Sequence, residues 1–367
     1  MSIPEDLIPE ILSHLFRLPV KSLVRLQCVS NSWFALINEP RFIKMHLESN
    51  SERTLLVQTW NCKADRPLNY YLVDLSDESR PVKIFPPFYN PDRFSEIVGC
   101  CDGLVCTRTY DDETVIWNPS VRKYKKLPSL PTVRAPGLPP NFEYGFNFAF
   151  GYDPVKDDYK VLRIVEYFES SDEEFAGAFE VKVYSLKAHC WTSAQDKWPY
   201  SESRISSAGP VFVNGALHWL VKTATRGITL LAFHLATEKF QEHRLPVEPQ
   251  SVKTLEVLGG SLCVSAYGPD ADAQSIEFWM MKERSCWSRL CTVPTFHYEK
   301  PLKAWRVVFS TTDGQKVVME MDYGCKNLFW YDIKNNTRNI FLTHIRNKRW
   351  IGTCVGSLLL LHGDSVI

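Results

Sequence analysis

The sequence lacks the spacings and runs that mark metal, phosphate and membrane chemistry. Its 11 cysteines form no Cys-x-x-Cys pair, and its 9 histidines form no His-x-x-x-His or His-Glu-x-x-His motif. No glycine-rich loop is followed by the Lys-Ser or Lys-Thr of a phosphate-binding loop. Apolar runs such as residues 358–361 are far too short to cross a bilayer. These absences predict a protein with no cofactor, no metal site and no membrane partner.

The chain also has no excess of charge of either sign. Lys+Arg and Asp+Glu both number 42, so no net field draws the protein toward nucleic acid, which is not an expected partner. The cysteines are odd in number and scattered, and several lie in apolar runs, as Cys106 and Cys263 do, which favours reduced, buried thiols. Glu5 and Asp6 stand where a secretory signal needs a basic flank. We therefore expect a soluble protein of the cytoplasm, the nucleus or both.

What the sequence does contain is two segments of different character. With 367 residues, 45% hydrophobic and 23% charged, the chain can form a large core and more than one folding unit. Residues 1–45 carry helix-start signals, in which Pro4 and Pro9 are each followed by acidic residues. The segment predicts a helix over residues 9–16, a second over 19–27, and a third that Ser30 caps and that extends to residue 37.

The helical segment holds more apolar side chains than one small core can bury. A unit of this size buries little of its own surface, so some of these side chains must cover something else. The cover is either a partner protein or the C-terminal part of the same chain, and composition does not separate these alternatives.

Five short motifs in the helical segment carry a specific resemblance. They are Ile3-Pro4-Glu5-Asp6-Leu7-Ile8, Glu10-Ile11-Leu12, Leu18-Pro19-Val20-Lys21-Ser22-Leu23, Cys28-Val29-Ser30-Asn31-Ser32-Trp33 and Leu36-Ile37-Asn38-Glu39-Pro40-Arg41-Phe42. Together they resemble an F-box. The resemblance implies three helices that dock to a Skp-type adaptor, which joins them to the cullin and RING subunits of a ubiquitin ligase. It also implies the residues that meet the adaptor or shape the surface that does: Pro4, Leu7, Ile8, Ile11, Leu12, Leu15, Leu18, Pro19, Val20, Leu23, Val29, Trp33, Leu36 and Ile37.

One feature departs from the F-box pattern. Three residues, about Phe16-Arg17-Leu18, are inserted between the first and second helix blocks. Absorbed within a helix, they would rotate the following register by about 60°. Absorbed in a loop, they would leave the docking surface unchanged, and the sequence leaves both alternatives open.

From residue 54 onward a strand–turn–strand unit recurs. The units span residues 69–86, 115–128, 181–193, 231–246, 276–290 and 328–342. Their central aromatic residues are Tyr71, Trp117, Tyr184, Phe233, Trp279 and Tyr331. These anchors lie roughly 46 to 52 residues apart, except for one longer interval that contains a proline-rich stretch and an acidic stretch.

A second turn-and-strand block precedes most of the units. Its turns are Asp102-Gly103, Asn214-Gly215, Gly259-Gly260 and Asp313-Gly314. About four strands per repeat is typical of a propeller blade, whereas a β-sandwich has no reason to repeat at a fixed period. The predicted fold is therefore mainly β, with a small N-terminal three-helix F-box (residues 1–45) followed by a six-bladed kelch-like β-propeller (residues 54–362).

The repeats also resemble a known domain. The motifs are Cys101-Asp102-Gly103-Leu104-Val105-Cys106, Trp117-Asn118-Pro119, Gly151-Tyr152-Asp153-Pro154, Asp158-Tyr159-Lys160-Val161 and Trp330-Tyr331-Asp332. They look like the plant F-box-associated domain over nearly all of residues 54–362, although a single Gly-Gly pair departs from a strict kelch pattern. The resemblance implies a plant F-box protein related to the S-locus F-box-like proteins, whose propeller captures a protein target.

The two ends of the repeat region complement each other. Residues 353–362 have strand character, but no strand–turn–strand unit follows them to complete a blade. Residues 54–60 begin the first blade, which in turn is short of one strand. Because an open ring would expose strand edges that invite aggregation, we expect both segments in one blade.

Long connections in the repeats predict where a target binds. The turns between the first and second strands and between the third and fourth strands of a blade are short. The longer segments connect the second strand to the third and one blade to the next, so they lie at the opposite end of the blades. Loops on a rigid scaffold are where recognition usually takes place. Aromatic or charged residues in these segments are the candidate target-binding residues: Tyr110, Glu169, Asp172, Arg226, Tyr298 and Arg346.

No catalytic residue is expected. The His, Cys and Asp residues show no nucleophile–base grouping that a sequence can reveal. We expect a non-catalytic substrate-recognition subunit of a Skp–cullin–F-box ubiquitin ligase. The alternatives are a propeller binding protein that acts outside the ligase and a propeller-fold enzyme.

Overall fold

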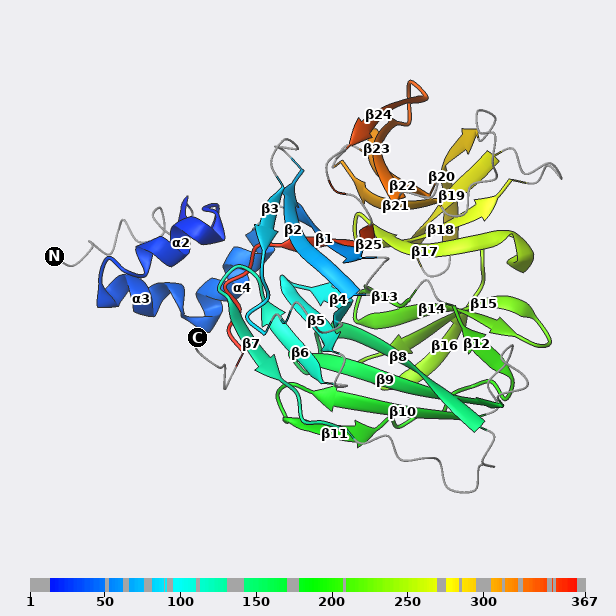
Figure 1. The fold of residues 1–367 in the computed structure, drawn as a ribbon, viewed down its shortest axis with the longest axis horizontal. Helices are drawn as coiled ribbons and strands as arrows, with labels where there is room; N and C mark the ends of the chain where they lie inside the picture. Colours follow the sequence, from blue (N-terminus) through cyan, green and yellow to red (C-terminus); the bar gives the residue numbers. More distant parts are fainter. Residues whose placement is uncertain are drawn as a thin grey trace. The chain divides into compact units, whose positions relative to one another are not determined.

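The computed structural model divides the chain into two compact units (Figure 1). The first contains residues 1–127 and 349–367, and the second contains residues 128–348. The structure describes residues 14–49, 53–61, 66–75, 81–88, 90, 95–109, 113–130, 142–169, 178–206, 209–268, 275–283, 286–294, 305–311, 314–322, 326–341, 345 and 348–361.

Three helices open the described part of the first unit: α2 (Val20–Leu26), α3 (Asn31–Ile37) and α4 (Pro40–Ser49). Ser30 caps α3 as predicted, because its hydroxyl oxygen accepts a hydrogen bond from the Trp33 amide at 3.3 Å. Most of the predicted first helix lies outside the described residues, although His14 and Leu15 are helical. The sequence analysis did not predict α4 as a separate helix. This helix begins at Pro40, a residue that is tolerated in the first turn of a helix.

The first unit contains two blades of four antiparallel strands. Blade I has the strand order β25 (Lys348–Val355), β1 (Arg53–Asn61), β2 (Arg66–Asp74) and β3 (Val82–Ile84). Blade II consists of β4 (Ser95–Cys101), β5 (Leu104–Thr109), β6 (Thr114–Asn118) and β7 (Lys123–Lys126).

The second unit contains four blades. Blade III consists of β8 (Phe142–Asp153), β9 (Asp158–Glu169), β10 (Ala178–Ser185) and β11 (Cys190–Ser193). In blade IV, β12 (Ser203–Ile205) and β13 (Val211–Val213) both pair with β14 (Ala216–Thr223), and β15 (Gly227–His234) and β16 (Lys239–His243) follow. Blade V consists of β17 (Val252–Leu258), β18 (Ser261–Tyr267), β19 (Ser275–Glu283) and β20 (Cys286–Pro294), and a short helix η2 (Pro249–Ser251) precedes it. Blade VI consists of β21 (Trp305–Ser310), β22 (Lys316–Asp322), β23 (Lys326–Asp332) and β24 (Thr337–Phe341).

These six sheets confirm the predicted six-bladed propeller and its repeat. Every aromatic anchor lies in the third strand of its blade. Trp117, Tyr184 and Phe233 are fully buried there, whereas the deeply buried aromatic residues of blades I and V are Tyr70 and Phe278, one residue before the predicted anchors. Because successive residues of a strand face opposite sides, Tyr71 and Trp279 keep the period of the repeat but not the burial of the other anchors.

The short hairpin turns have the backbone that their sequences require. Asp102 and Gly103 have φ of 51° and 78°, and Asn214 and Gly215 have φ of 51° and 75°. Two consecutive left-handed residues define the type I′ turn that fits the twist of a two-stranded hairpin. The Asp-Gly and Asn-Gly pairs were therefore correctly identified as tight turns between strands.

The last strand of the propeller pairs with the first. In blade I, β25 lies beside β1, which confirms that the two ends of the repeat region share a blade. The predicted closing strand over residues 353–362 was misplaced, because the strand covers residues 348–355 and residues 356–361 join no sheet. The Thr54 hydroxyl also donates to the Cys354 carbonyl at 3.0 Å. Blade I therefore draws one strand from a part of the sequence about 300 residues away from the other three.

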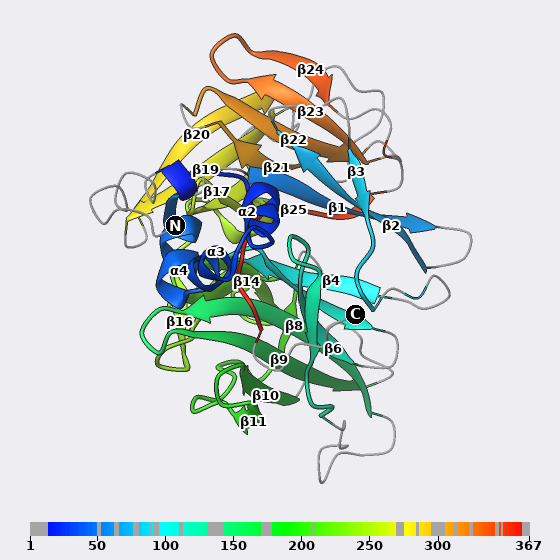
Figure 2. The ribbon, with the colours of Figure 1, turned by 90° about the vertical axis from the view of Figure 1, so that its left-hand side faces the viewer.

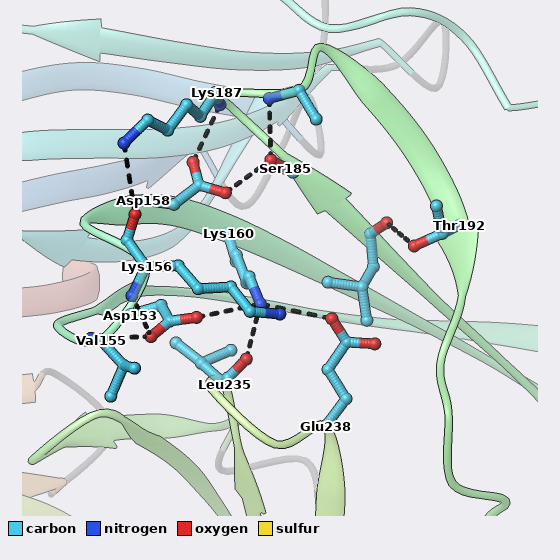
Figure 3. A network of polar contacts seen from close by, with 12 residues as sticks. Asp153, Val155, Lys156, Asp158, Lys160, Ser185, Lys187, Thr192, Leu235 and Glu238 are labelled. Carbon is cyan, nitrogen blue, oxygen red and sulfur yellow. Dashed lines mark hydrogen bonds and ion pairs between the residues drawn. The ribbon is translucent and has the colours of Figure 1, made fainter.

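A buried lysine joins blades III and IV within the second unit (Figure 3). Lys160 Nζ on β9 lies 3.1 Å from Asp153 Oδ2 and 3.3 Å from Glu238 Oε1, and it donates to the Leu235 carbonyl at 2.6 Å. Nearby, Asp158 accepts hydrogen bonds from the Ser185 hydroxyl and the Lys187 amide. A buried ammonium group is tolerated only when it is paired in this way.

A cluster of histidines lies on blade IV. His218 on β14 is buried, and its ring centroid lies 6.1 Å from that of His243 on β16. Burial, helped by His243 and His234, lowers the pKa of His218 from 6.5 to about 4. In the folded protein His218 is therefore neutral at neutral pH.

Removal of residues 350–367 is expected to make the protein insoluble. The deletion leaves β1 as an unpaired edge, which invites aggregation. The soluble fraction after expression and the melting temperature are the measurements. A matched deletion of residues 362–367 keeps β25 and should remain soluble, and an unchanged melting temperature for the longer deletion would contradict the role of β25.

The stability of the protein is expected to fall as the pH decreases from about 6.5 to about 4. Below pH 6.5 the unfolded chain binds a proton at His218, whereas the folded chain binds it only near pH 4. The stability that depends on a neutral His218 is therefore fully present above pH 6.5 and is lost as the pH falls toward 4. The loss is up to about 3 kcal/mol. Chemical denaturation at several pH values should show a flatter profile for His218→Gln, whereas the exposed His14, changed to Gln, should leave the profile as it is.

Candidate functional site

The helices of the first unit share one apolar cluster. It contains Leu15, Phe16, Val20, Leu23, Ile37, Phe42, Ile43 and, from the far end of the sequence, Leu358. α3 lies against both α2 and α4 (Figure 2). This cluster fixes how the helices present their remaining side chains.

The predicted adaptor-binding residues fall into distinct environments. Leu15, Val20, Leu23 and Ile37 are buried in the cluster, and Leu18, Trp33 and Leu36 are partly buried against it. Pro19 and Val29 are exposed. Pro4, Leu7, Ile8, Ile11 and Leu12 lie outside the described residues. Among the described residues, the buried members support the shape of the surface, and the exposed ones are free to meet a partner.

Three large apolar side chains in the described part of the helical segment lie open to solvent. Val29, between α2 and α3, is 64% exposed, Phe34 in α3 is 55% exposed, and Met45 in α4 is 38% exposed. Phe34 was missing from the predicted adaptor-binding residues. The sequence carries no signal for its exposure, because adjacent residues about 100° apart around a helix can both face one core, as Phe42 and Ile43 of α4 do. Side chains this exposed also occur in the propeller, so it is the place of Val29 and Phe34 in the helical segment that makes them candidates for contact with a partner protein.

The three inserted residues form a turn between helices. The Arg17 amide donates to the His14 carbonyl at 3.2 Å, and the Leu18 amide donates to the Leu15 carbonyl at 3.0 Å. The Phe16 ring packs on Phe42 with 5.0 Å between centroids, and His46 Nε2 lies 2.9 Å from the Leu18 carbonyl oxygen. The insertion is therefore absorbed outside the helices, and its side chains and backbone contact α4.

The candidate target-binding residues are placed only in part. Arg226 is exposed in the three-residue connection between β14 and β15. Glu169 is the last residue of β9. Tyr110, Asp172, Tyr298 and Arg346 lie outside the described residues. In an antiparallel blade, the connection from the second to the third strand and the connection to the next blade leave from the same end, so Arg226 shares its end of blade IV with residues 194–202.

Polar and aromatic contacts order this end of blade IV. Arg226 forms an exposed ion pair with Glu242 at 3.3 Å, and the Tyr200 hydroxyl donates to the same carboxylate at 3.0 Å. Burial is the main cause that raises the pKa of Tyr200 to about 12, so the phenol remains a donor. Trp198 stacks on Phe179 with 4.7 Å between centroids and meets the edge of Phe240. Sequence reasoning missed Trp198 and Tyr200, which only their aromatic character within a polar loop could have indicated.

No group of three or more His, Cys, Asp or Glu side chains among the described residues is arranged to hold a metal ion. No helix in the described ranges is long and apolar enough to cross a membrane.

Comparison with known proteins agrees with this architecture. Residues 1–45 match the F-box domain, and residues 69–359 match the F-box associated beta propeller domain. The F-box protein CPR1 of Arabidopsis thaliana is 29% identical over 365 residues, which cover 91% of this chain and 83% of that protein. An F-box/kelch-repeat protein of Arabidopsis thaliana is 26% identical over 363 residues, which cover 91% of each chain. The chain therefore belongs to the plant F-box proteins that carry an F-box associated beta propeller domain.

Proposed function

We propose that this protein is the substrate-recognition subunit of a Skp–cullin–F-box ubiquitin ligase. The observation that carries the proposal is the pair of exposed apolar side chains, Val29 and Phe34, on a helical segment that matches the F-box. The chain's own core leaves this surface uncovered, as a site for a Skp-type adaptor requires. The adaptor then connects the protein to cullin and RING subunits.

In this proposal the protein works by proximity. The helices hold the chain on the ligase, and the propeller holds a protein target beside the bound conjugating enzyme. The protein contributes no catalytic residue of its own. We further propose that the target binds the end of the blades that carries the longer connections, and that the protein acts in the cytoplasm, the nucleus or both.

Charge placed on the exposed helix surface is expected to weaken adaptor binding. Val29→Glu and Phe34→Glu should each lower the affinity for a Skp-type adaptor at least about tenfold, because a carboxylate would be desolvated in an apolar interface. Isothermal titration calorimetry on the full chain is the measurement.

The propeller offers matched controls for these changes. Val82 is 60% exposed and Phe85 is 57% exposed, so Val82→Glu and Phe85→Glu make the same substitutions at similar exposure away from the helices. The controls should bind the adaptor as the parent chain does. Equal losses in both pairs would contradict an adaptor surface on the helices.

Charge reversal at the end of blade IV with the longer connection is expected to reduce target capture. Arg226→Glu breaks the pair with Glu242 and reverses the exposed charge, whereas Lys187→Glu and Lys334→Glu change exposed residues of the short turns at the opposite end of their blades. Quantitative mass spectrometry of proteins bound by adaptor-loaded variants is the measurement. Loss of a bound protein with Lys187→Glu and Lys334→Glu but not with Arg226→Glu would show that the target binds the other end.

A further inference from the structure

The segment that follows β25, residues 356–361, runs through the first unit without joining a sheet. We call this segment the strap; it is red in Figure 1. Its first half lies on two turns of blade II, and its second half reaches the apolar cluster of the helices. The strap therefore contacts both the propeller and the helical segment.

The turn between β4 and β5 is shaped to receive the strap. A Cβ atom at Gly103 would lie 2.4 Å from Ser357 Cβ and 2.5 Å from the Val355 carbonyl oxygen. Gly103 also has φ of 78°, which an L side chain rarely adopts. Only glycine satisfies both demands at this position.

The turn between β6 and β7 binds the strap backbone. Asn118 is fully buried, and its Nδ2 donates to the carbonyls of Ser357 at 2.9 Å and Leu359 at 3.0 Å. The Ser357 amide in turn donates to the Ser120 hydroxyl at 3.2 Å. These bonds satisfy backbone groups of the strap that have no neighbouring strand, so the path of the strap is specified.

The strap then inserts a leucine among the helices. Leu358 is 3% exposed and packs in the cluster with Leu15, Val20 and Phe42, while Leu359 and Val121 of blade II pack at its margin. Leu360 is 46% exposed. The two leucines thus differ in burial although only one residue separates them, which makes them a matched pair.

We propose that the strap locks the helical segment onto blade II, and that Leu358 and Asn118 are the positioning residues of this lock. Leu358 enters the buried cluster of the helices, and Val121 of blade II packs against the same cluster, so the strap and blade II contact the helices together. The functional consequence rests on the function proposed above: the lock sets the distance and angle between the adaptor and a target held by the propeller.

Hydrogen exchange of the full chain tests the lock without any partner. In Leu358→Ala, amides of α2–α4 should exchange at least about tenfold faster, because removing a buried leucine side chain loosens the packing of the helices. Amides of β5 and β6 should keep their rates, and Leu360→Ala should change neither set. Unchanged exchange in the helices, or equal acceleration in β5 and β6, would overturn the proposal. If Leu358→Ala is not obtained folded, Leu358→Val is tested by the same criteria.

A second measurement separates this inference from the proposed function. With the Skp-type adaptor and the target both at saturating concentration, so that any change of affinity is overcome, Leu358→Ala should ubiquitinate the bound target several-fold more slowly than the parent chain in a reconstituted ligase. A parent rate of ubiquitination despite faster helix exchange would overturn the positioning role. Failure of the parent chain to bind any Skp-type adaptor would refute the proposed function and leave the exchange result as the test of the lock.

Discussion

The pairing of β25 with β1 is the interaction on which the rest of this structure depends. The pairing completes blade I as a four-stranded sheet, and the Thr54–Cys354 contact in it joins residues about 300 positions apart. Blade I therefore cannot be completed until nearly the whole chain is available. The same pairing also determines where the chain leaves blade I, and so brings the strap to blade II and to the helices. The completion of blade I and the path of the strap both follow from one strand pairing.

The motifs that identify the propeller maintain its architecture. Asp153 and Lys160 connect blades III and IV, Asp158 orders the turn that contains Lys187, and Gly103 and Asn118 receive the strap. None of these residues lies in the longer connections that are the candidate target surface. A relative can therefore keep every such motif while its loops change, which allows one scaffold to present different surfaces.

Much of the fold could be predicted from the sequence because it depends on local rules. The period of the aromatic anchors gives the third strand of each blade, and the Asp-Gly and Asn-Gly pairs give its tight turns. The side of the strand on which an aromatic lies, as at Tyr70 and Phe278, depends on register and on irregularities such as the shift between Phe278 and Trp279 in the pairing of β19 with β20. Leu358 carried no signal at all, because an apolar run in a final segment does not reveal that its partner is the first segment. The candidate site follows the same division: the F-box motifs were evident, whereas Phe34, Trp198 and Tyr200 required knowledge of exposure and of contacts distant in sequence.

The insertion in the helical segment and the strap contact the same apolar cluster. Phe16 packs on Phe42, and the Leu18 carbonyl meets His46, so the extra turn fastens the preceding chain to α4. Phe16 and Phe42 belong to the same cluster as Leu358. The inserted Phe16 therefore adds apolar surface to the buried cluster that Leu358 of the strap also enters, whereas Val29 and Phe34 stay exposed. Insertion and strap thus both add contacts to the buried cluster that fixes how the helices present Val29 and Phe34.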